Sequence, residues 1–332
     1  MLQPPSLKQA LLYPVTTSVA VLAMIVTGMH WTGQDIEWLT MKGRIWSNWE
    51  LCRALTATLP HGGVFHLAFN LYWLWTFGTL VERVYGHLKY ALILILLAFG
   101  SMLAEFTFLE GGIGLSGVGY GLWGMLWVLE KRDARFADAV DFQTSRLFVI
   151  WFVLCIVLTL TNVMPVANLA HGVGAITGVL LGMAAIHSGA ARWKSCAGLV
   201  LVLAFGILGS TVLWPTLNLT PYAEEQIEQA GVNAIVAHDP VRGEKFLEVA
   251  TGIRRAPART WYNLGVAREQ LGQMDGALAA FDHAAAMLDG DNDMQNAADR
   301  LRSLLKIRSS MTQAAGSATN LGTALPTVRT NQ

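Results

Sequence analysis

A single serine lies within a stretch of closely spaced glycines. Residues 114–124 read Gly-Leu-Ser-Gly-Val-Gly-Tyr-Gly-Leu-Trp-Gly, with the hydroxyl at Ser116. In a helix, Gly117, Gly121 and Gly124 fall on one face, so another helix could approach to backbone contact. Ser116 would begin that helix, close to unpaired backbone N–H groups and the positive end of the helix dipole. This position suits a nucleophile, although on this stretch alone a serine that merely caps the helix is the more common explanation.

A second series of glycines follows a histidine. Gly174, Gly178 and Gly182 repeat every four residues after His171. Two helices with smooth faces are expected to pack closely, and this packing would bring His171 to Ser116. A serine needs a base to become nucleophilic, and an imidazole of ordinary pKa can serve near neutral pH.

Two further polar residues, His66 and Asn70, lie one helical turn apart in another apolar segment. Polar groups inside a membrane are costly, so each is a candidate functional residue. Together with the backbone N–H of Ser116, they could donate hydrogen bonds to a developing oxyanion. No acidic residue is placed to orient His171, so the serine and histidine would form a dyad. Tyr120, one turn after Ser116, could hold the imidazole by packing on it.

The composition is that of a membrane protein. Of the 332 residues, 53% are hydrophobic and 14% are charged, and a net charge of zero gives no indication of nucleic-acid binding. The three cysteines have neither metal-site spacing nor the pattern of a disulfide framework. A bilayer span needs roughly 20 apolar residues. We predict seven spans, at about 11–29, 61–81, 88–108, the Ser116 segment, 147–163, 168–186 and 196–214.

Lysine and arginine are concentrated in alternate loops. They follow the second, fourth and sixth predicted spans, whereas the loops after the third and fifth contain none. The positive-inside rule, with Lys8 on the same side, predicts a cytoplasmic N-terminus and an extracytoplasmic C-terminal region. The first outer loop is an exception, because it carries Lys42 and Arg44. The span that begins near Ser116 and the span that begins near His171 both enter the membrane from the outer side. The two side chains are therefore expected at similar depth in the membrane.

After Pro215 the sequence changes to that of a soluble helical module. The residues that match the spacing of a tetratricopeptide repeat are Trp261, Leu264, Gly265, Ala277, Phe281 and Ala284. A pair of helices is predicted before this repeat, over 230–254, and a single helix after it, over 294–308. A helical hairpin without special function is the competing interpretation. We predict a transmembrane domain over 1–217, a tetratricopeptide-like helical domain over 218–310 and a disordered tail over 311–332.

Taken together, residues 51–183 resemble the rhomboid family of intramembrane serine proteases. Residues 114–117, Gly-Leu-Ser-Gly, are similar to the family's G-x-S-G box, in which Gly114 and Gly117 flank the nucleophile Ser116. Residues 170–178, Ala-His-x2-Gly-x3-Gly, resemble the box that carries the general base, here His171.

The resemblance extends to residues around the two boxes. His66-x3-Asn70 resembles the family's oxyanion-hole pair, and His61 matches a further family histidine. Tyr120 matches the aromatic residue that stacks on the base. Glu82-x3-Gly86 resembles the motif that closes the second span. Arg53 matches the arginine of the family's Trp-Arg loop motif, although Cys52 stands at the tryptophan position.

The resemblance implies an all-α polytopic membrane bundle, with a six-helix core and a seventh span, followed here by the small helical repeat domain. It also implies a water-filled cavity that is open to the outer face. Transmembrane protein substrates would be cleaved near their outer ends through an acyl-enzyme, without metal or cofactor. The expected surroundings are a lipid bilayer, in a bacterial cytoplasmic membrane, and protein partners could bind the C-terminal repeat.

Two other classes of function are compatible with parts of this pattern. A haem-binding membrane protein could use His66 and His171 as axial ligands, but this leaves Ser116, Asn70 and the glycine faces unexplained. The stronger alternative is a catalytically inactive adaptor that holds client helices in the bundle.

Overall fold

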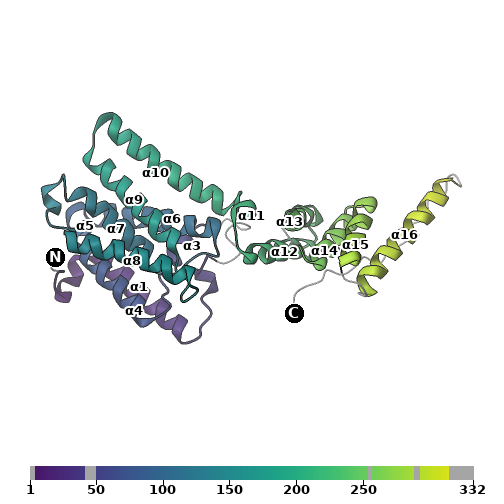
Figure 1. The fold of residues 1–332 in the computed structure, drawn as a ribbon, viewed down its shortest axis with the longest axis horizontal. Coiled ribbons are helices and arrows are strands. Elements are labelled where there is room, and N and C mark those ends of the chain that lie inside the picture. The colour runs from purple at the N-terminus through teal and green to yellow at the C-terminus, as the bar shows by residue number, and fades with distance from the viewer. Residues whose placement is uncertain (1–3, 42–49, 253–255, 288–291, 314–332) are drawn as a thin grey trace. The chain divides into compact units, whose positions relative to one another are not determined.

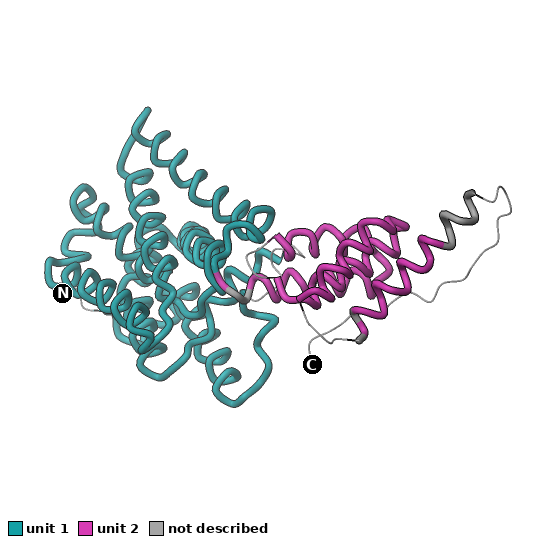
Figure 2. Tube along the Cα trace, turned by 45° about the vertical axis from the view of Figure 1, so that its right-hand side comes forward, with its two compact units in different colours: residues 1–219 teal, residues 220–332 magenta. Residues whose placement is uncertain are grey.

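The computed structural model describes residues 4–41, 50–252, 256–287 and 292–313, which form helices and no strand. The chain divides into two compact units, Met1–Leu219 and Thr220–Gln332 (Figure 2). The sequence analysis put this division after residue 217. Lys42 and Arg44 of the first outer loop lie outside the described residues, as do residues 314–332 of the expected tail.

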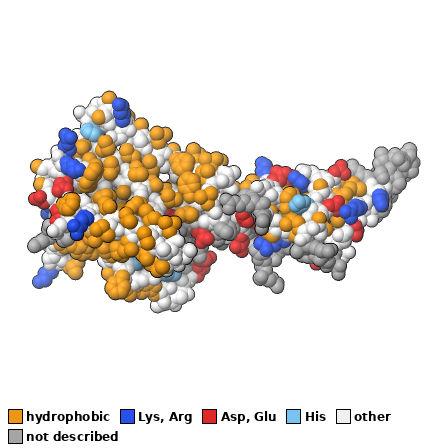
Figure 3. Space-filling model, viewed as in Figure 1, with side chains coloured by type: hydrophobic (Ala, Val, Ile, Leu, Met, Phe, Trp, Pro, Cys, Tyr) orange, Lys and Arg blue, Asp and Glu red, His pale blue; other side chains and the backbone are white. Residues whose placement is uncertain are grey.

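The first unit is a bundle of long apolar helices (Figure 1). Six of them are long and apolar enough to cross a membrane, which confirms an all-α polytopic bundle. Their side chains cover most of the visible face of this unit with apolar atoms (Figure 3). The six are α1 (Pro14–Trp31), the continuous helix Val64–Tyr85, α6 (His87–Phe108), α8 (Phe142–Leu160), α9 (Asn168–Ile186) and α10 (Gly189–Ser210).

The segment expected as the fourth span is a shorter helix. This helix, α7 (Ser116–Leu129), has 14 residues, so it is about 21 Å long at 1.5 Å per residue. The hydrocarbon core of a bilayer is about 30 Å thick. One end of α7 must therefore lie below the membrane surface if the bundle spans a bilayer.

Glycines set the distance between α7 and α9. A Cβ atom added at Gly174 would collide with the carbonyl oxygen of Gly117, and one added at Gly178 would collide with that of Gly121. A Cβ atom at Gly124 would lie 2.5 Å from the carbonyl oxygen of Ala175. The close packing predicted for the two glycine faces is thus present, and it rests on direct backbone contact.

The helix Val64–Tyr85 is interrupted by a π-helical turn. It consists of α4 (Val64–Trp73), the π turn η3 (Leu74–Gly78) and α5 (Thr79–Tyr85). A Cβ atom at Gly78 would collide with the hydroxyl of Tyr90, so the widened turn admits a close contact with α6. The span begins three residues later than the expected start at residue 61, which leaves His61 in the preceding loop.

Two spans begin earlier than their apolar runs suggested. The helix α8 begins at Phe142, where the expected span began at about 147, because the Asp141 carboxylate caps it by accepting from Thr144 N at 2.7 Å. The helix α10 begins at Gly189, where the expected span began at about 196. Arg192 in its first turn donates from Nε to the carbonyl oxygen of His187 at 2.9 Å. The Asp141 cap thus extends α8 beyond its hydrophobic part, whereas the Arg192 contact joins the start of α10 to the C-terminal end of α9.

Short elements complete the first unit. They are η1 (Leu7–Leu12), η2 (Glu37–Leu39), α3 (Arg53–Thr56), η4 (Ala134–Phe136) and α11 (Trp214–Leu217). The last of these is held against the C-terminal end of α6. Trp214 Nε1 donates to Phe106 O at 2.9 Å, and Asn218 Nδ2 donates to Leu109 O at 2.7 Å. The chain is therefore fixed to α6 at the point where the first unit ends.

In its described residues, the second unit contains five helices. They are α12 (Pro221–Val236), α13 (Pro240–Gly252), α14 (Ala258–Gln270), α15 (Met274–Met287) and α16 (Asn292–Gln313). The expected repeat corresponds to the hairpin of α14 and α15, in which Gly265 packs directly against the ring of Phe281. The first helix of the preceding pair begins at Pro221 and not at about 230. The last helix reaches Gln313, beyond both its expected end at 308 and the expected start of the tail at 311.

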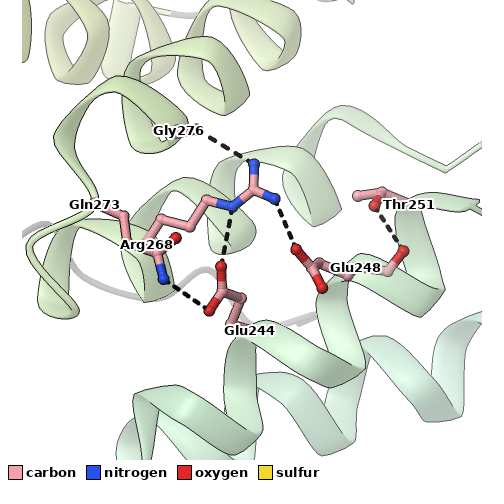
Figure 4. A network of polar contacts seen from close by, with 6 residues as sticks. All are labelled: Glu244, Glu248, Thr251, Arg268, Gln273 and Gly276. Atoms are coloured by element: carbon pink, nitrogen blue, oxygen red, sulfur yellow. Dashed lines mark hydrogen bonds and ion pairs between the residues drawn. The ribbon is translucent and has the colours of Figure 1, made fainter.

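An arginine occupies the position where a tetratricopeptide repeat usually has an aromatic residue. Arg268 donates to Glu244 at 3.3 Å and to Glu248 at 2.8 Å, and so joins α14 to α13 (Figure 4). It also donates to the carbonyl oxygen of Gly276 on α15 at 3.4 Å. The three helices are thus connected by a polar network at this point.

Candidate active site

The first residue of α7 meets the fourth residue of α9. The Oγ atom of Ser116 lies 2.7 Å from Nε2 of His171, which is the distance of a short hydrogen bond. The imidazole is buried, whereas the serine is partly exposed. Ser116 also stands at the N-terminus of α7, where the first backbone N–H groups have no partner within the helix.

The imidazole of His171 is fixed by an aromatic ring and not by an acid. The ring of Tyr120 stacks on it with centroids 4.7 Å apart and planes 26° apart. The Tyr120 hydroxyl donates to Phe148 O at 2.9 Å, which fixes the phenol ring in turn. Among the described residues, nothing hydrogen-bonds to the buried Nδ1 of His171. The arrangement is therefore that of a pair and not of a triad.

The loop before Ser116 depends on a glycine. Gly114 has φ +105°, a conformation that other residues rarely adopt, and a Cβ atom there would lie 2.7 Å from the His66 ring. Its N–H donates to Ala57 O at 3.1 Å. The glycine thus lets His66 come close to the loop that leads to Ser116.

His61 holds the same loop by a hydrogen bond. Its Nε2 accepts from Leu115 N at 3.3 Å, and its Nδ1 lies 2.9 Å from Leu59 O. Since Nε2 accepts, the proton must be on Nδ1, which donates it to Leu59 O. His61 lies outside the spanning helices, and its burial, reinforced by the adjacent His66, lowers its pKa to about 4. The neutral form that this contact requires is therefore present at neutral pH.

His66 and Asn70 lie one turn apart on α4, as expected from their spacing. The His66 ring packs edge-on against His61, with centroids 4.8 Å apart. Asn70 is buried, and its Nδ2 donates to His66 O at 2.9 Å. Within the described part of the chain, no hydrogen bond joins Asn70 to Ser116 or His171. Both side chains carry donors, but the Asn70 amide is turned toward its own helix.

Arg53 holds the segment that follows α1. Its guanidinium donates to Glu37 O at 2.8 Å and to Thr40 O at 3.1 Å, and it forms an ion pair with Glu50. These contacts do not involve Cys52, which occupies the tryptophan position of the family motif.

One polar residue near the dyad was not identified in the sequence analysis. The Glu105 carboxylate, on α6, is buried and accepts from Ala170 N at 2.9 Å, next to His171. A charged residue inside a predicted span is itself a signal of function. This rule would have identified Glu105, which lies in the third predicted span.

Part of the chain matches a family model. Residues 48–188 match the family model described as Rhomboid domain. This match supports the rhomboid family for that part of the chain. The matched residues include the helices α4 to α9, with Ser116 and His171. Of the residues described above around Ser116, His171 and Arg53, only Glu37 and Thr40 lie outside the match.

Curated relatives match a similar part of the chain. Rhomboid protease GlpG of Serratia proteamaculans is 30% identical over 175 residues, which cover 51% of this chain and 61% of that protein. The GlpG protein of Pectobacterium atrosepticum is 31% identical over 173 residues, with the same coverage. RHOMBOID-like protein 6, mitochondrial, of Arabidopsis thaliana is 31% identical over 149 residues, which cover 44% of this chain and 47% of that protein. The chain spans about three fifths of the length of the GlpG relatives.

Proposed function

We propose that the protein is an intramembrane serine endopeptidase that cleaves transmembrane protein substrates. The observation that carries this proposal is the 2.7 Å contact between Ser116 Oγ and His171 Nε2 inside an apolar helical bundle. The match of residues 48–188 to the Rhomboid domain model and the GlpG relatives support the same conclusion.

The reaction uses the serine as nucleophile and the histidine as general base. Nε2 of His171 takes the proton while Ser116 Oγ attacks the carbonyl carbon of the scissile peptide bond. The leaving amine receives that proton, and an ester to Ser116 remains. Water, activated by the same imidazole, then hydrolyses the ester. Tyr120 stacks on the imidazole and keeps Nε2 directed at the serine, in place of an acidic residue.

The oxyanion is stabilised by donors that surround the serine. The backbone N–H of Ser116 lies in the first turn of α7, where such groups have no partner within the helix, and the side chains of His66 and Asn70 supply further donors. His66 already lies against the loop at Gly114. Because the Asn70 amide donates to His66 O in the free protein, it would have to rotate to reach an oxyanion.

The cleaved bond lies near the outer face of the membrane. Both α7 and α9 carry their reactive residue at the N-terminal end, so the two residues share one depth. The distribution of lysine and arginine places that end toward the outside, with the N-terminus of the chain in the cytoplasm. In a substrate helix the carbonyl groups are hydrogen-bonded, so the segment to be cut must unwind first.

We infer that the chain crosses the membrane seven times, with the short helix α7 as the fourth crossing, so that the second unit is on the same side of the membrane as the proposed dyad. We infer that it recruits protein partners or substrates as a repeat-like module. A reporter enzyme fused after Leu305 and active only outside the cytoplasm tests this topology. Reporter activity restricted to the cytoplasm would put the unit across the membrane from the dyad and exclude docking beside it.

Covalent labelling tests the chemistry. A fluorophosphonate probe should label the purified full-length protein in detergent, and Ser116→Ala should abolish the labelling and the cleavage of a transmembrane substrate. His171→Ala should have the same effect, and the double variant should be no worse than either single one, since the two residues act as a unit. Ser188→Ala is a matched control outside the site. A correctly folded wild-type protein that neither labels nor cleaves would favour the inactive adaptor.

A further inference from the structure

The buried Glu105 is the starting point for a further inference. It lies on α6, which packs against both helices that carry the proposed dyad. A charged side chain within a spanning helix is costly to bury unless it has partners. Its partner is the backbone N–H of Ala170, which donates to Glu105 Oε2 at 2.9 Å. The carboxyl group is therefore used to bind the beginning of another helix.

The helix that Glu105 binds has no cap of its own. The N-cap position of α9 is Ala167, whose side chain cannot accept a hydrogen bond from the first turn. The first backbone N–H groups of a helix have no partner within it. Glu105 supplies that partner from α6, 65 residues earlier in the chain. His171 follows directly after Ala170, so the capped turn is the one that carries the general base.

Neighbouring contacts relate this turn to Ser116. Ser101, one helical turn before Glu105, packs against Gly117. A Cβ atom added at Gly117 would lie 2.7 Å from the Cβ atom of Ser101. In the loop before Ser116, a Cβ atom at Gly112 would lie 2.7 Å from the Ala167 Cβ and 3.8 Å from the Glu105 Cγ. The same end of α6 therefore touches the start of α7 and the start of α9.

These contacts fix the position of α9 along its axis, which the glycine faces of α7 and α9 do not fix. Glycines let α7 and α9 approach closely, but side-chain-free surfaces do little to prevent one helix from sliding along the other. A hydrogen bond from a third helix fixes the height of α9 at its first turn. Because the dyad depends on a single contact between the two helix starts, a small shift of α9 would break it.

We propose that Glu105 is a positioning residue that caps α9 and holds His171 at the height of Ser116. The proposal rests on the function proposed above, in which His171 acts as the base for Ser116. The carboxyl oxygen acts as a hydrogen-bond acceptor, so a residue with an acceptor at the same place can replace it.

Glu82 offers a matched control in the same bundle. Its buried carboxylate accepts from Val15 N and Thr16 N at 2.9 Å each, so it caps the first turn of α1 as Glu105 caps that of α9. The helix α1 carries none of the residues proposed for the chemistry. Loss of either carboxyl group should lower stability, but only the loss of Glu105 should move the dyad.

The test compares Glu105→Ala, Glu105→Gln and Glu82→Ala in the full-length protein, well below the melting temperature of each. For Glu105→Ala we expect the rate of fluorophosphonate labelling and kcat to fall by about 100-fold, with KM nearly unchanged. Glu105→Gln should remain within about tenfold of the wild type, because its amide oxygen can accept the same hydrogen bonds. The Glu82→Ala variant should react with the fluorophosphonate probe at the wild-type rate when the rate is divided by the fraction of folded protein. Wild-type labelling by Glu105→Ala, or a Glu105→Gln variant as slow as Glu105→Ala, would overturn the proposal.

Hydrogen–deuterium exchange separates this inference from the proposed function. Peptides that contain residues 168–172 should exchange faster in Glu105→Ala than in the wild type or in Glu82→Ala. Unchanged exchange there contradicts the capping role, whether or not the protein is a protease. If the wild type does not label but Glu105→Ala exchanges faster in this segment, the proposed protease function is wrong and the capping of α9 by Glu105 is supported. If Glu105→Ala does not fold, Glu105→Asp, whose carboxyl group is one methylene shorter, replaces it in both measurements.

Discussion

The Cα of Gly178 lies against the carbonyl oxygen of Gly121, so the backbones of α9 and α7 touch at this point. A methyl group at Gly178 would collide with that oxygen, whereas one at Gly121 would meet the end of the Leu97 side chain on α6. Both helices carry a proposed catalytic residue near their N-terminal ends, and the contact lies between one and two turns after Ser116 and after His171. The spacing of the two helices is therefore also the spacing of the dyad.

We expect Gly178→Ala to destabilise the protein and to slow cleavage. Overpacking usually costs about 1–3 kcal/mol, and here the added methyl group meets backbone and not a side chain that can move away. Thermal unfolding in detergent and the rate of substrate cleavage measure the two effects. Gly119→Ala is the matched control, because a Cβ atom there has nothing within 4 Å. It should leave the melting temperature unchanged or slightly higher, since alanine is the better helix former. Equal behaviour of the two variants would contradict the packing argument.

Removal of the oxyanion donors should slow cleavage without abolishing it. Asn70→Ala leaves the backbone N–H of Ser116 in place, and a single donor in a well-formed site is worth about 2.7–4 kcal/mol. We expect a kcat at least tenfold below the wild type for Asn70→Ala, and His66→Ala to be at least as damaging. The His66 ring also packs against Gly114 and His61. Wild-type rates in both variants would mean that the donors lie elsewhere.

Stability should decrease on acidification because of His61. Its pKa is lowered to about 4 by burial, whereas an unfolded histidine titrates near 6.5. Between these values the unfolded chain binds the proton and the folded one does not, so the free energy of unfolding rises with pH. The contribution is complete above about pH 6.5, is lost as the pH falls to about 4, and amounts to at most about 3 kcal/mol.

The variant His61→Gln should flatten this pH dependence, because glutamine does not titrate. Melting temperatures from pH 4 to pH 7 measure it. His30→Gln provides the control, since His30 is exposed at the end of α1. A slope that is the same in the wild type and in both variants would show that other groups cause the acid sensitivity.

Removal of the second unit should leave the proposed chemistry intact. A chain that ends after Leu219 keeps all groups of the site and the contacts of Trp214 and Asn218 with α6. We expect it to cleave a generic transmembrane substrate at the full-length rate and physiological substrates that need docking more slowly. A chain that ends after Leu213 loses both contacts and should melt at a lower temperature. Loss of generic cleavage after the longer truncation would show that the second unit contributes to the site.

Much of this molecule follows from local patterns in the sequence. Hydrophobic runs predict the spans, because a helix must present apolar side chains along its whole length to cross a bilayer. The glycine spacings predict the faces of α7 and α9, because helical periodicity places residues four apart on one side. Ser116 and His171 were found for the same reason, as polar residues next to these faces.

The tertiary structure decided the contacts that join distant segments. The start of α8 depends on the capping carboxylate of Asp141, which an apolar pattern does not reveal. Glu105 lies 65 residues from Ala170 in the chain, and no spacing rule connects an acceptor on one helix with a free N–H on another. Arg53 likewise binds carbonyl oxygens of Glu37 and Thr40, and any residue has such groups. Periodicity thus determines which face of a helix is buried, whereas the height and partner of each helix emerge only when the bundle is assembled.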